Sequence, residues 1–168
     1  MAEQQTFLQT IQSGEFQEFI LEVRGHANEM TIEVAPARLH EAMLVLKNQF
    51  GFNYLVDITA SDYYTDEKRF ELAYNIVSMN NRQRLRISIA LEEDHPVAAT
   101  ITDIWSSAAW YEREAFDMMG IRFEGHEDLR RIYMPEDFQW YPMRKEFPLL
   151  GIPGSIELPE KDPPKEYK

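Results

Sequence analysis

Residues 70–91 read FELAYNIVSMNNRQRLRISIAL, and this stretch decides the fold. Apolar residues alternate with polar or small ones on both sides of a short polar segment, Met79–Arg82. A period of two is typical of a strand that buries one face, and a polar, Asn-rich segment favours a tight turn. The stretch therefore predicts two antiparallel strands joined by a hairpin. Their shared apolar face would consist of Phe70, Leu72, Tyr74, Ile76, Leu85, Ile87, Ile89 and Leu91.

The sequence around this hairpin predicts further strands and three helices. We expect a helix over residues 4–13, strands over 19–23 and 30–34 with a turn over 24–29, a helix from Pro36 to Phe50, a strand over 52–58 and a helix over 108–119. Gly51 and Gly120 can adopt the left-handed conformation that ends a helix. This order predicts an α+β fold: one domain, with helices packed on one face of a mostly antiparallel or mixed sheet.

The C-terminal part differs from the rest of the chain in its amino-acid composition. Seven of the 9 prolines lie between Pro135 and Pro164. Proline lacks the N–H that helices and sheets require, so this part is expected to run as an extended arm. Its apolar content is high as far as Ile152, which means that either this domain or a partner should cover it. We divide the chain into an α+β domain (1–120), an extended partner-binding arm (121–152) and a flexible polar tail (153–168).

Composition excludes several classes of function. The 168 residues carry a net charge of −12, which disfavours nucleic-acid binding. They contain no cysteine, so thiolate zinc sites, a cysteine nucleophile and a self-ligated iron–sulfur cluster are excluded. The longest apolar run, Ala42–Leu46, is far shorter than the about 20 residues that cross a bilayer, so direct membrane insertion is not expected. The first ten residues show no secretory signal, which indicates a cytoplasmic-type protein.

The helix predicted over 108–119 is the most informative element. A helical wheel places Ala108, Tyr111, Ala115, Met118 and Met119 on a core-facing arc, and Trp110, Arg113, Glu114 and Asp117 on the opposite arc. Tryptophan and arginine are enriched in protein–protein contacts. Two interpretations stay open at this point: a protein interface, or an ordinary surface helix with an Arg113–Asp117 ion pair one turn apart.

The sequence signals for a catalytic, metal-binding or phosphate-binding site are weak. The carboxylate pairs Glu112/Glu114 and Glu127/Asp128 do not share a helix face, so they would not converge on one substrate atom. The four histidines (His26, His40, His95 and His126) lack metal-ligand spacing, and His126 is best explained as a loop residue before an N-capping Asp128. Phosphate-binding glycine motifs are absent. The basic pairs Arg130–Arg131 and Arg144–Lys145 are bordered by acids, which favours ion pairs with another protein or with this domain itself.

The stretch from Trp110 to Pro148, WYEREAFDMMGIRFEGHEDLRRIYMPEDFQWYPMRKEFP, resembles the NuoC family, the subunits related to the thirty-kilodalton subunit of mitochondrial complex I. Met134–Asp137 and Pro142–Pro148 are similar to the family's MPEDW and PLRKDFP runs. Small departures occur at Glu127, Met143 and Glu146. The family signature is filled by Glu112, Arg113, Glu114, Asp117, Met118, Met119, His126, Arg130, Ile132 and Tyr133.

This resemblance implies a non-catalytic subunit of the peripheral arm of a respiratory complex I-type NADH:quinone oxidoreductase. Such a complex passes electrons from NADH to quinone and couples this to proton translocation. The chain would dock on the hydrogenase-like large subunit and adjacent subunits, on the cytoplasmic side of the inner membrane. FMN, iron–sulfur clusters and quinone would lie in partner subunits. The partner interface is predicted at Trp110, Glu112, Arg113, Glu114, Asp117, His126, Arg130, Arg131, Arg144 and Lys145.

Two alternatives remain. The same module would fit a related membrane-bound hydrogenase or a ferredoxin- or F420-linked complex, because the electron donor is bound by other subunits. A stand-alone hydrolase that uses acidic residues would need a cleft of converging carboxylates, and the sequence offers no sign of one.

Overall fold

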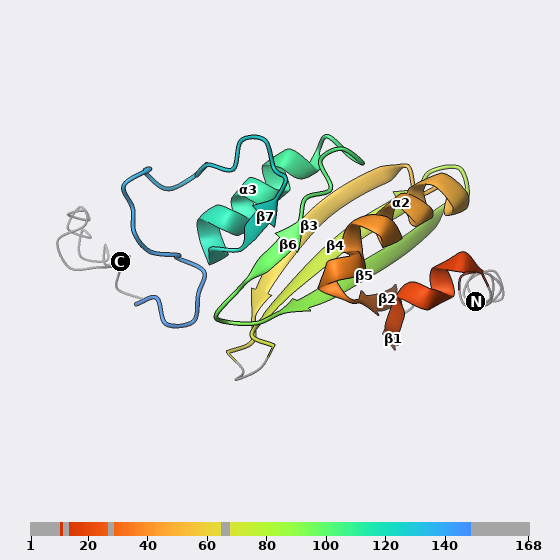
Figure 1. Cartoon of the computed structure of the whole chain (residues 1–168), viewed down its shortest axis with the longest axis horizontal. Coiled ribbons are helices and arrows are strands. Elements are labelled where there is room, and N and C mark those ends of the chain that lie inside the picture. Colours follow the sequence, from red (N-terminus) through yellow and green to blue (C-terminus); the bar gives the residue numbers. More distant parts are fainter. Residues whose placement is uncertain (1–10, 12–13, 27–28, 65–67, 149–168) are drawn as a thin grey trace, which may run out of the picture.

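The computed structural model describes residues 11, 14–26, 29–64 and 68–148. At its centre is a five-stranded sheet with strand order β1-β2-β5-β4-β3 (Figure 1). The predicted α+β class is confirmed, and the sheet is mixed. Its strands are β1 (Ile20–His26), β2 (Glu29–Val34), β3 (Tyr54–Asp62), β4 (Phe70–Ser78) and β5 (Gln83–Leu91).

The hairpin that decides the fold has the predicted register. Strands β4 and β5 are antiparallel, and Tyr74 lies opposite Ile87. The alternate apolar side chains of both strands are buried. On its other side β5 pairs in parallel with β2, where Ile32 lies opposite Ile87. One long apolar face therefore extends over three strands.

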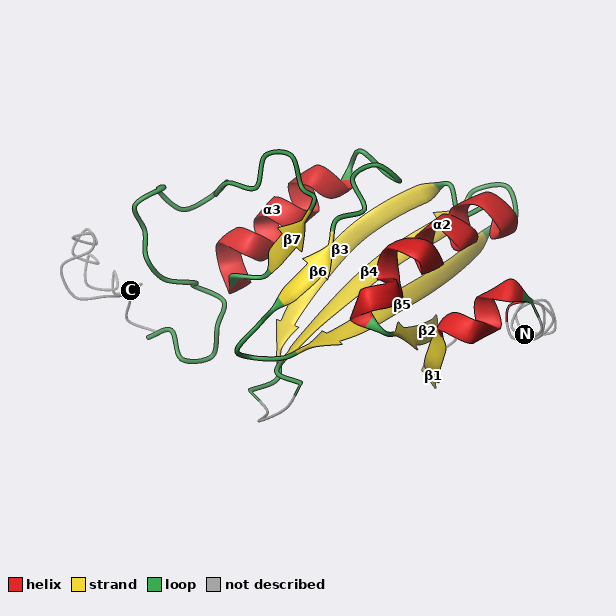
Figure 2. Ribbon diagram, in the orientation of Figure 1, coloured by secondary structure: helices red, strands yellow, loops and turns green. Residues whose placement is uncertain are grey.

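Helix α2 (Leu39–Phe50) covers that apolar face (Figure 2). It follows a short 3-10 turn, η2 (Pro36–Arg38), which begins at the predicted proline. Leu39, Met43 and Leu46 are buried, as the helical spacing predicts. Gly51 ends the helix in the left-handed conformation (φ 72°). A second 3-10 segment, η1 (Glu15–Phe19), packs beside α2 through Phe16 and Phe50.

Strand β3 departs from the prediction. The alternation of Phe52, Tyr54, Val56 and Ile58 predicts that these four side chains share one buried face, yet Tyr54 and Val56 are exposed and Leu55 is buried. A bulge between Leu55 and Asp57 inverts the alternation. An extra residue in a strand moves the side chains on one side of it to the opposite face, and a single-sequence pattern does not reveal it.

Two short strands follow the main sheet. Strands β6 (Val97–Ala99) and β7 (Arg122–Glu124) pair in parallel and flank helix α3 (Ala108–Met119). The predicted arm begins at residue 121, so its first residues are in fact a strand. From 125 to 148 the chain has neither helix nor strand, in agreement with its prolines. The predicted helix over 4–13 (except Ile11, which is buried), the end of the arm (149–152) and the tail (153–168) lie outside the described residues.

Candidate protein interface on α3 and the C-terminal arm

Residues 125–148 form a long loop at the α3 side of the molecule, away from α2 (Figures 1 and 2). Such a loop needs partners for its main-chain polar groups. Three side chains of the α+β domain supply them, namely Asp62, Arg113 and Asp117, and Arg69 adds an ion pair with the Glu146 side chain. The arm is therefore attached to its own domain at several points.

Asp117 of α3 binds the first part of the arm. One carboxylate oxygen accepts the main-chain N–H groups of Ile132, Tyr133 and Met134 at 2.9, 2.6 and 3.0 Å. The other accepts Arg131 Nη1 at 2.7 Å. Burial alone would raise the pKa of Asp117, but these four donors hold it below its usual range. The carboxylate is therefore charged, and both of its oxygens accept hydrogen bonds from the arm.

Arg113 binds the same part of the arm from the preceding turn of α3. Its Nε and Nη2 donate to the carbonyl oxygens of Arg130 and Arg131 at 3.1 and 3.2 Å. Its guanidinium lies 4.9 Å from the centre of the Trp110 ring, so the indole is held against a fixed cation. Arg113 thus fixes both the arm and an exposed tryptophan.

His126 adds a third attachment. Its Nδ1 accepts the Asp128 N–H at 3.0 Å, which leaves Nε2 to donate to the Ala109 carbonyl at 3.2 Å. The Asp128 N–H is used by the histidine, and the Asp128 carboxylate pairs with Arg130 at 3.0 Å. His126 is therefore a structural loop residue.

The end of α3 contacts the second part of the arm at close range. Gly120 has φ 75°, and a Cβ placed on it would lie 2.6 Å from a ring carbon of Tyr141 and 2.7 Å from Arg144 Nη2. Arg144 Nε donates to the Met119 carbonyl at 2.7 Å, which satisfies a free carbonyl at the helix end. Glycine is required here both for the backbone angle and for the approach of the arm.

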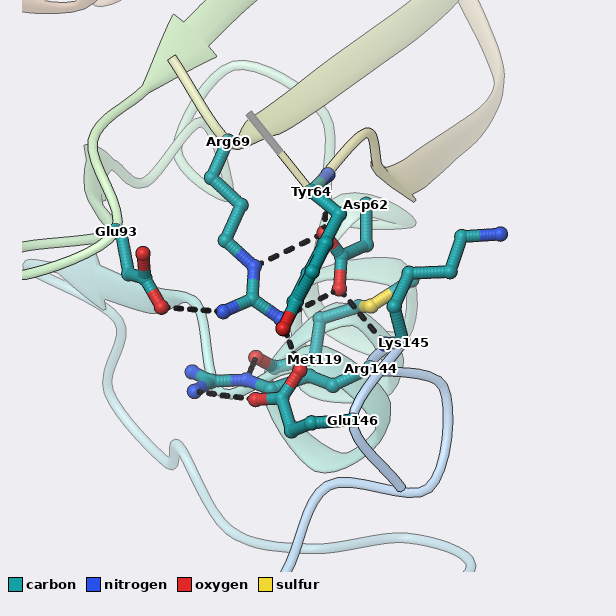
Figure 3. A network of polar contacts seen from close by, with 8 residues as sticks. All are labelled: Asp62, Tyr64, Arg69, Glu93, Met119, Arg144, Lys145 and Glu146. Atoms are coloured by element: carbon teal, nitrogen blue, oxygen red, sulfur yellow. Dashed lines mark hydrogen bonds and ion pairs between the residues drawn. The ribbon is translucent and has the colours of Figure 1, made fainter. Parts of the chain in front are cut away.

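Asp62 and Arg69 form the centre of the last attachment (Figure 3). Arg69 donates through Nε and Nη2 to the two oxygens of Asp62 at 3.0 and 2.8 Å, and both side chains are buried. The same guanidinium pairs with Glu93 and with Glu146 of the arm. Asp62 also accepts the main-chain N–H of Lys145 at 2.8 Å. One buried ion pair thus connects strand β3, strand β4 and the arm.

The charge state of this centre is well defined. Hydrogen bonds from Arg69 lower the pKa of Asp62 to about 2, although burial opposes the shift. The same bonds raise the pKa of Arg69 far above its ordinary value. Both groups are therefore ionised at any physiological pH.

Arginines and aromatic rings alternate from this centre into the arm. Each guanidinium lies 4.6–5.7 Å from the centres of two rings. A cation over a ring face is attracted to it, and the long side chains of the stack exclude water from one another. The order is Tyr64, Arg69, Phe70, Arg144, Tyr141, Arg131 and Phe138.

Large side chains on the outside remain exposed. Trp110 is 62% exposed and Trp140 is 45% exposed, and Tyr133 and Met143 are exposed as well. The main chain of the arm is thus fixed to the domain, while Tyr133, Trp140 and Met143 of the arm and Trp110 of α3 face outward. This arrangement is typical of a surface that another protein covers.

The ten residues predicted at the interface fall into two groups. Trp110, Glu114, Arg130 and Lys145 are exposed. The other six contact this chain's own groups, and Glu112 and Asp117 are fully buried. Asp117 lies on the arc opposite the core, as the wheel predicts, but it is buried because the arm of this chain covers that arc. The wheel was incomplete for Glu112, which belongs to the core-facing arc. The interface itself stays a prediction. The inward group is Glu112, Arg113, Asp117, His126, Arg131 and Arg144.

Sequence reasoning missed the centre formed by Asp62 and Arg69. None of the sequence patterns assigned a role to Asp62, Arg69 or Glu93. No local pattern distinguishes these residues from the other charged side chains of a strongly acidic chain. Their role depends on contacts between distant positions, such as Arg69 with Glu146, 77 positions apart, and Asp62 with Lys145, 83 positions apart.

A metal or membrane role gains no support from the described part of the chain. Its His, Asp and Glu side chains form no group of three or more that could hold a metal ion. None of its helices is both long and apolar enough to span a bilayer.

Residues 32–152 match the family described as the 30 kDa subunit of respiratory-chain NADH dehydrogenase. The C-type subunit of the NADH-quinone oxidoreductase of Geotalea uraniireducens is 39% identical over 89% of this chain and 87% of its own length. The second C-type subunit of the same enzyme from Rhizobium etli is 48% identical over 73% of this chain and 66% of its own length.

Two solved structures have the same fold. A trypsin-resistant fragment of Nqo5 superposes with a TM-score of 0.65 at 30% identity, over 76% of this chain and 99% of the fragment. A chain of a membrane-bound sulfane sulfur reductase, an archaeal respiratory membrane complex, superposes with a TM-score of 0.74 at 21% identity, over 89% of this chain and 88% of its own. The second likeness is one of fold alone.

Proposed function

We propose that this chain, which belongs to the family of the 30 kDa subunit of respiratory-chain NADH dehydrogenase, docks through α3 and its C-terminal arm on the hydrogenase-like large subunit of its complex. It is a non-catalytic subunit of an NADH-quinone oxidoreductase. In that complex it supports electron transfer from NADH to quinone, coupled to proton translocation. FMN, iron–sulfur clusters and quinone are bound by partner subunits, and the chain lies peripherally on the cytoplasmic side of the membrane.

One observation carries the proposal. The arm is fixed to its own domain by main-chain hydrogen bonds, while Trp110, Tyr133, Trp140 and Met143 remain exposed. A monomeric protein rarely leaves several large apolar side chains uncovered on rigid backbone, because each loses the free energy of burial. Fixed aromatic anchors also lose little conformational entropy when they bind, which favours tight association.

The acidic hydrolase loses support from the same geometry. Its candidate pair Glu112 and Glu114 is divided, because the first side chain is buried in the core and the second is exposed. The relatives from Geotalea uraniireducens and Rhizobium etli are both named as parts of NADH-quinone oxidoreductase, which favours that complex over a related hydrogenase.

The test is assembly with the large subunit. In a co-expression pull-down through a tagged large subunit, Trp110→Ala with Trp140→Ala should lower recovery of this chain more than about tenfold, since interface tryptophans commonly contribute about 2 kcal/mol or more each. The thermal melting point of the isolated variant should stay that of the wild type. Met79→Ala is the matched control, because Met79 is equally exposed but lies in the β4–β5 turn. Wild-type recovery of the double variant would overturn the proposal.

A further inference from the structure

Glu112 is the most unusual ionisable group in the described part of the chain. Its side chain is wholly buried on α3, and no lysine, arginine or histidine among the described residues forms an ion pair with it. Its carboxyl oxygens contact only two donors, the main-chain N–H of Ile101 at 2.8 Å and the hydroxyl of Thr100 at 2.5 Å. A buried carboxylate without a cation is costly, and two neutral donors offset only part of that cost.

The surroundings of Glu112 add nothing that favours a charge. From β4, the Tyr74 hydroxyl is fully buried and has no hydrogen-bond partner in the described structure. From the turn after β6, Asp103 contributes a second negative charge, although His40 of α2 pairs with it at 2.8 Å. Lys47 of α2 donates to the Ile104 carbonyl and not to Glu112. The charged group whose field acts on the Glu112 carboxyl group in the described structure is thus Asp103, and its charge is negative.

The contact joins two parts of the fold. Ile101 begins the turn that leads into α3, and its carbonyl accepts the N–H groups of Ile104 and Trp105. Thr100 donates its own N–H to the Glu124 carbonyl of β7. Glu112 therefore connects α3, which presents Trp110, to the turn and to the strand that precedes the arm.

We propose that Glu112 is a proton-linked contact: the protonated carboxyl group packs α3 tightly against residues 100–105, and loss of its proton to solvent loosens that packing. The mechanism requires only one proton exchanged with buffer and no other reactant. The packing of α3 against residues 100–105 therefore responds to pH. This response does not depend on which partner binds α3.

The direction of the effect follows from burial. Burial is the largest cause that raises the pKa of Glu112 from 4.5 to about 7, against the opposing hydrogen bonds of Ile101 and Thr100. Because the folded pKa lies above the unfolded one, the stabilisation is complete below about pH 4.5 and is lost as pH rises to about 7. The unfolding equilibrium constant should rise on the order of a hundredfold over this range from Glu112 alone.

The decisive experiment is an NMR titration of the full wild-type chain that follows the amide signals of Ile101 and its neighbours. We expect the Ile101 amide to titrate with a midpoint near pH 7, since its N–H donates to the titrating group (the midpoint is about the folded pKa). Glu112→Gln should abolish this titration. His40 pairs with Asp103 of the same turn, so His40→Gln is the matched control and should leave the midpoint in place.

A second measurement on the wild-type chain tests the proposal even if Glu112→Gln does not fold. In the wild-type chain, the glutamate side-chain carboxyl signals should include one with a midpoint near pH 7. The proposal fails if no glutamate carboxyl signal has a midpoint near pH 7, or if the Ile101 titration disappears in His40→Gln and persists in Glu112→Gln.

Discussion

The guanidinium of Arg69 contacts both carboxylate oxygens of Asp62, and the two side chains are only 3% and 0% exposed. Neither residue lies in the C-terminal arm, yet each binds it: Arg69 pairs with Glu146, and Asp62 accepts the Lys145 N–H. The geometry of the arm is thus set by a buried ion pair of the α+β domain (Figure 3). The arm is part of the fold as far as residue 148.

Arg69→Met should destabilise the chain strongly. The substitution leaves Asp62 buried without its cation, and breaking one side of a buried pair costs about 3–5 kcal/mol. Urea unfolding of the full chain measures the loss. Arg38→Met is the control, because Arg38 pairs with Glu18 and Glu41 at 2.8 Å on the surface, where solvent screening leaves such pairs a small contribution. Equal losses for the two variants would show that the buried pair has no special role.

Asp62 should also contribute to acid unfolding. Its folded pKa of about 2 lies below the ordinary 3.8, so its stabilisation is present above about pH 3.8 and is lost as pH falls to about 2. The full contribution is about 2 kcal/mol. The difference in free energy of unfolding between wild type and Asp62→Asn should shrink over this range. A constant difference down to about pH 2 would contradict the assigned role.

Gly120→Ala should displace the second part of the arm. The new Cβ would lie 2.6 Å from Tyr141, whereas at Gly51, which has a similar φ of 72°, the nearest atom would be 3.7 Å away. Gly51→Ala therefore carries the same backbone strain, about 1 kcal/mol, without the collision. Hydrogen exchange at the Met143 amide, which donates to the Met118 carbonyl, should accelerate only in Gly120→Ala. Unchanged protection there would mean that the arm tolerates the methyl group.

Two adjacent arginines should behave differently. Arg131→Ala removes a nearly buried side chain that binds Asp117, and we expect a loss of about 3 kcal/mol because a buried charge is left unpaired. Arg130→Ala removes an exposed partner of Asp128 and should cost about 0.5 kcal/mol. Chemical unfolding of the two variants side by side checks this. The reverse order would assign Arg131 to a partner and Arg130 to the fold.

Much of the fold could be predicted because local patterns determine it. The alternation in β4 and β5, the apolar stripe of α2 and the left-handed Gly51 each depend on residues within one element. The bulge in β3 and the short pair β6–β7 could not be predicted, because a bulge is set by the neighbouring strand and three-residue strands carry little signal.

The candidate site was predicted only in part. Trp110 and Arg130 are exposed, as the wheel and the basic cluster indicate. Asp117 and Glu112, which were predicted at the partner interface, are instead buried within this chain. A helical wheel cannot show that a distant proline-rich loop covers one arc or that a carboxyl group enters the core. Charge alone predicts exposure, and tertiary contacts overrule it at both positions.

Hydrogen exchange and oxidative footprinting of the free chain and of the assembled complex together test whether α3 and the arm form a preformed docking surface. We predict that the amides of Tyr133 and Lys145 are protected in both states, because Asp117 and Asp62 already accept them. The side chains of Trp110 and Trp140 should be oxidised in the free chain and protected in the complex. If those amides become protected only on assembly, or if both tryptophans stay reactive in the complex, the arm is not a preformed docking surface.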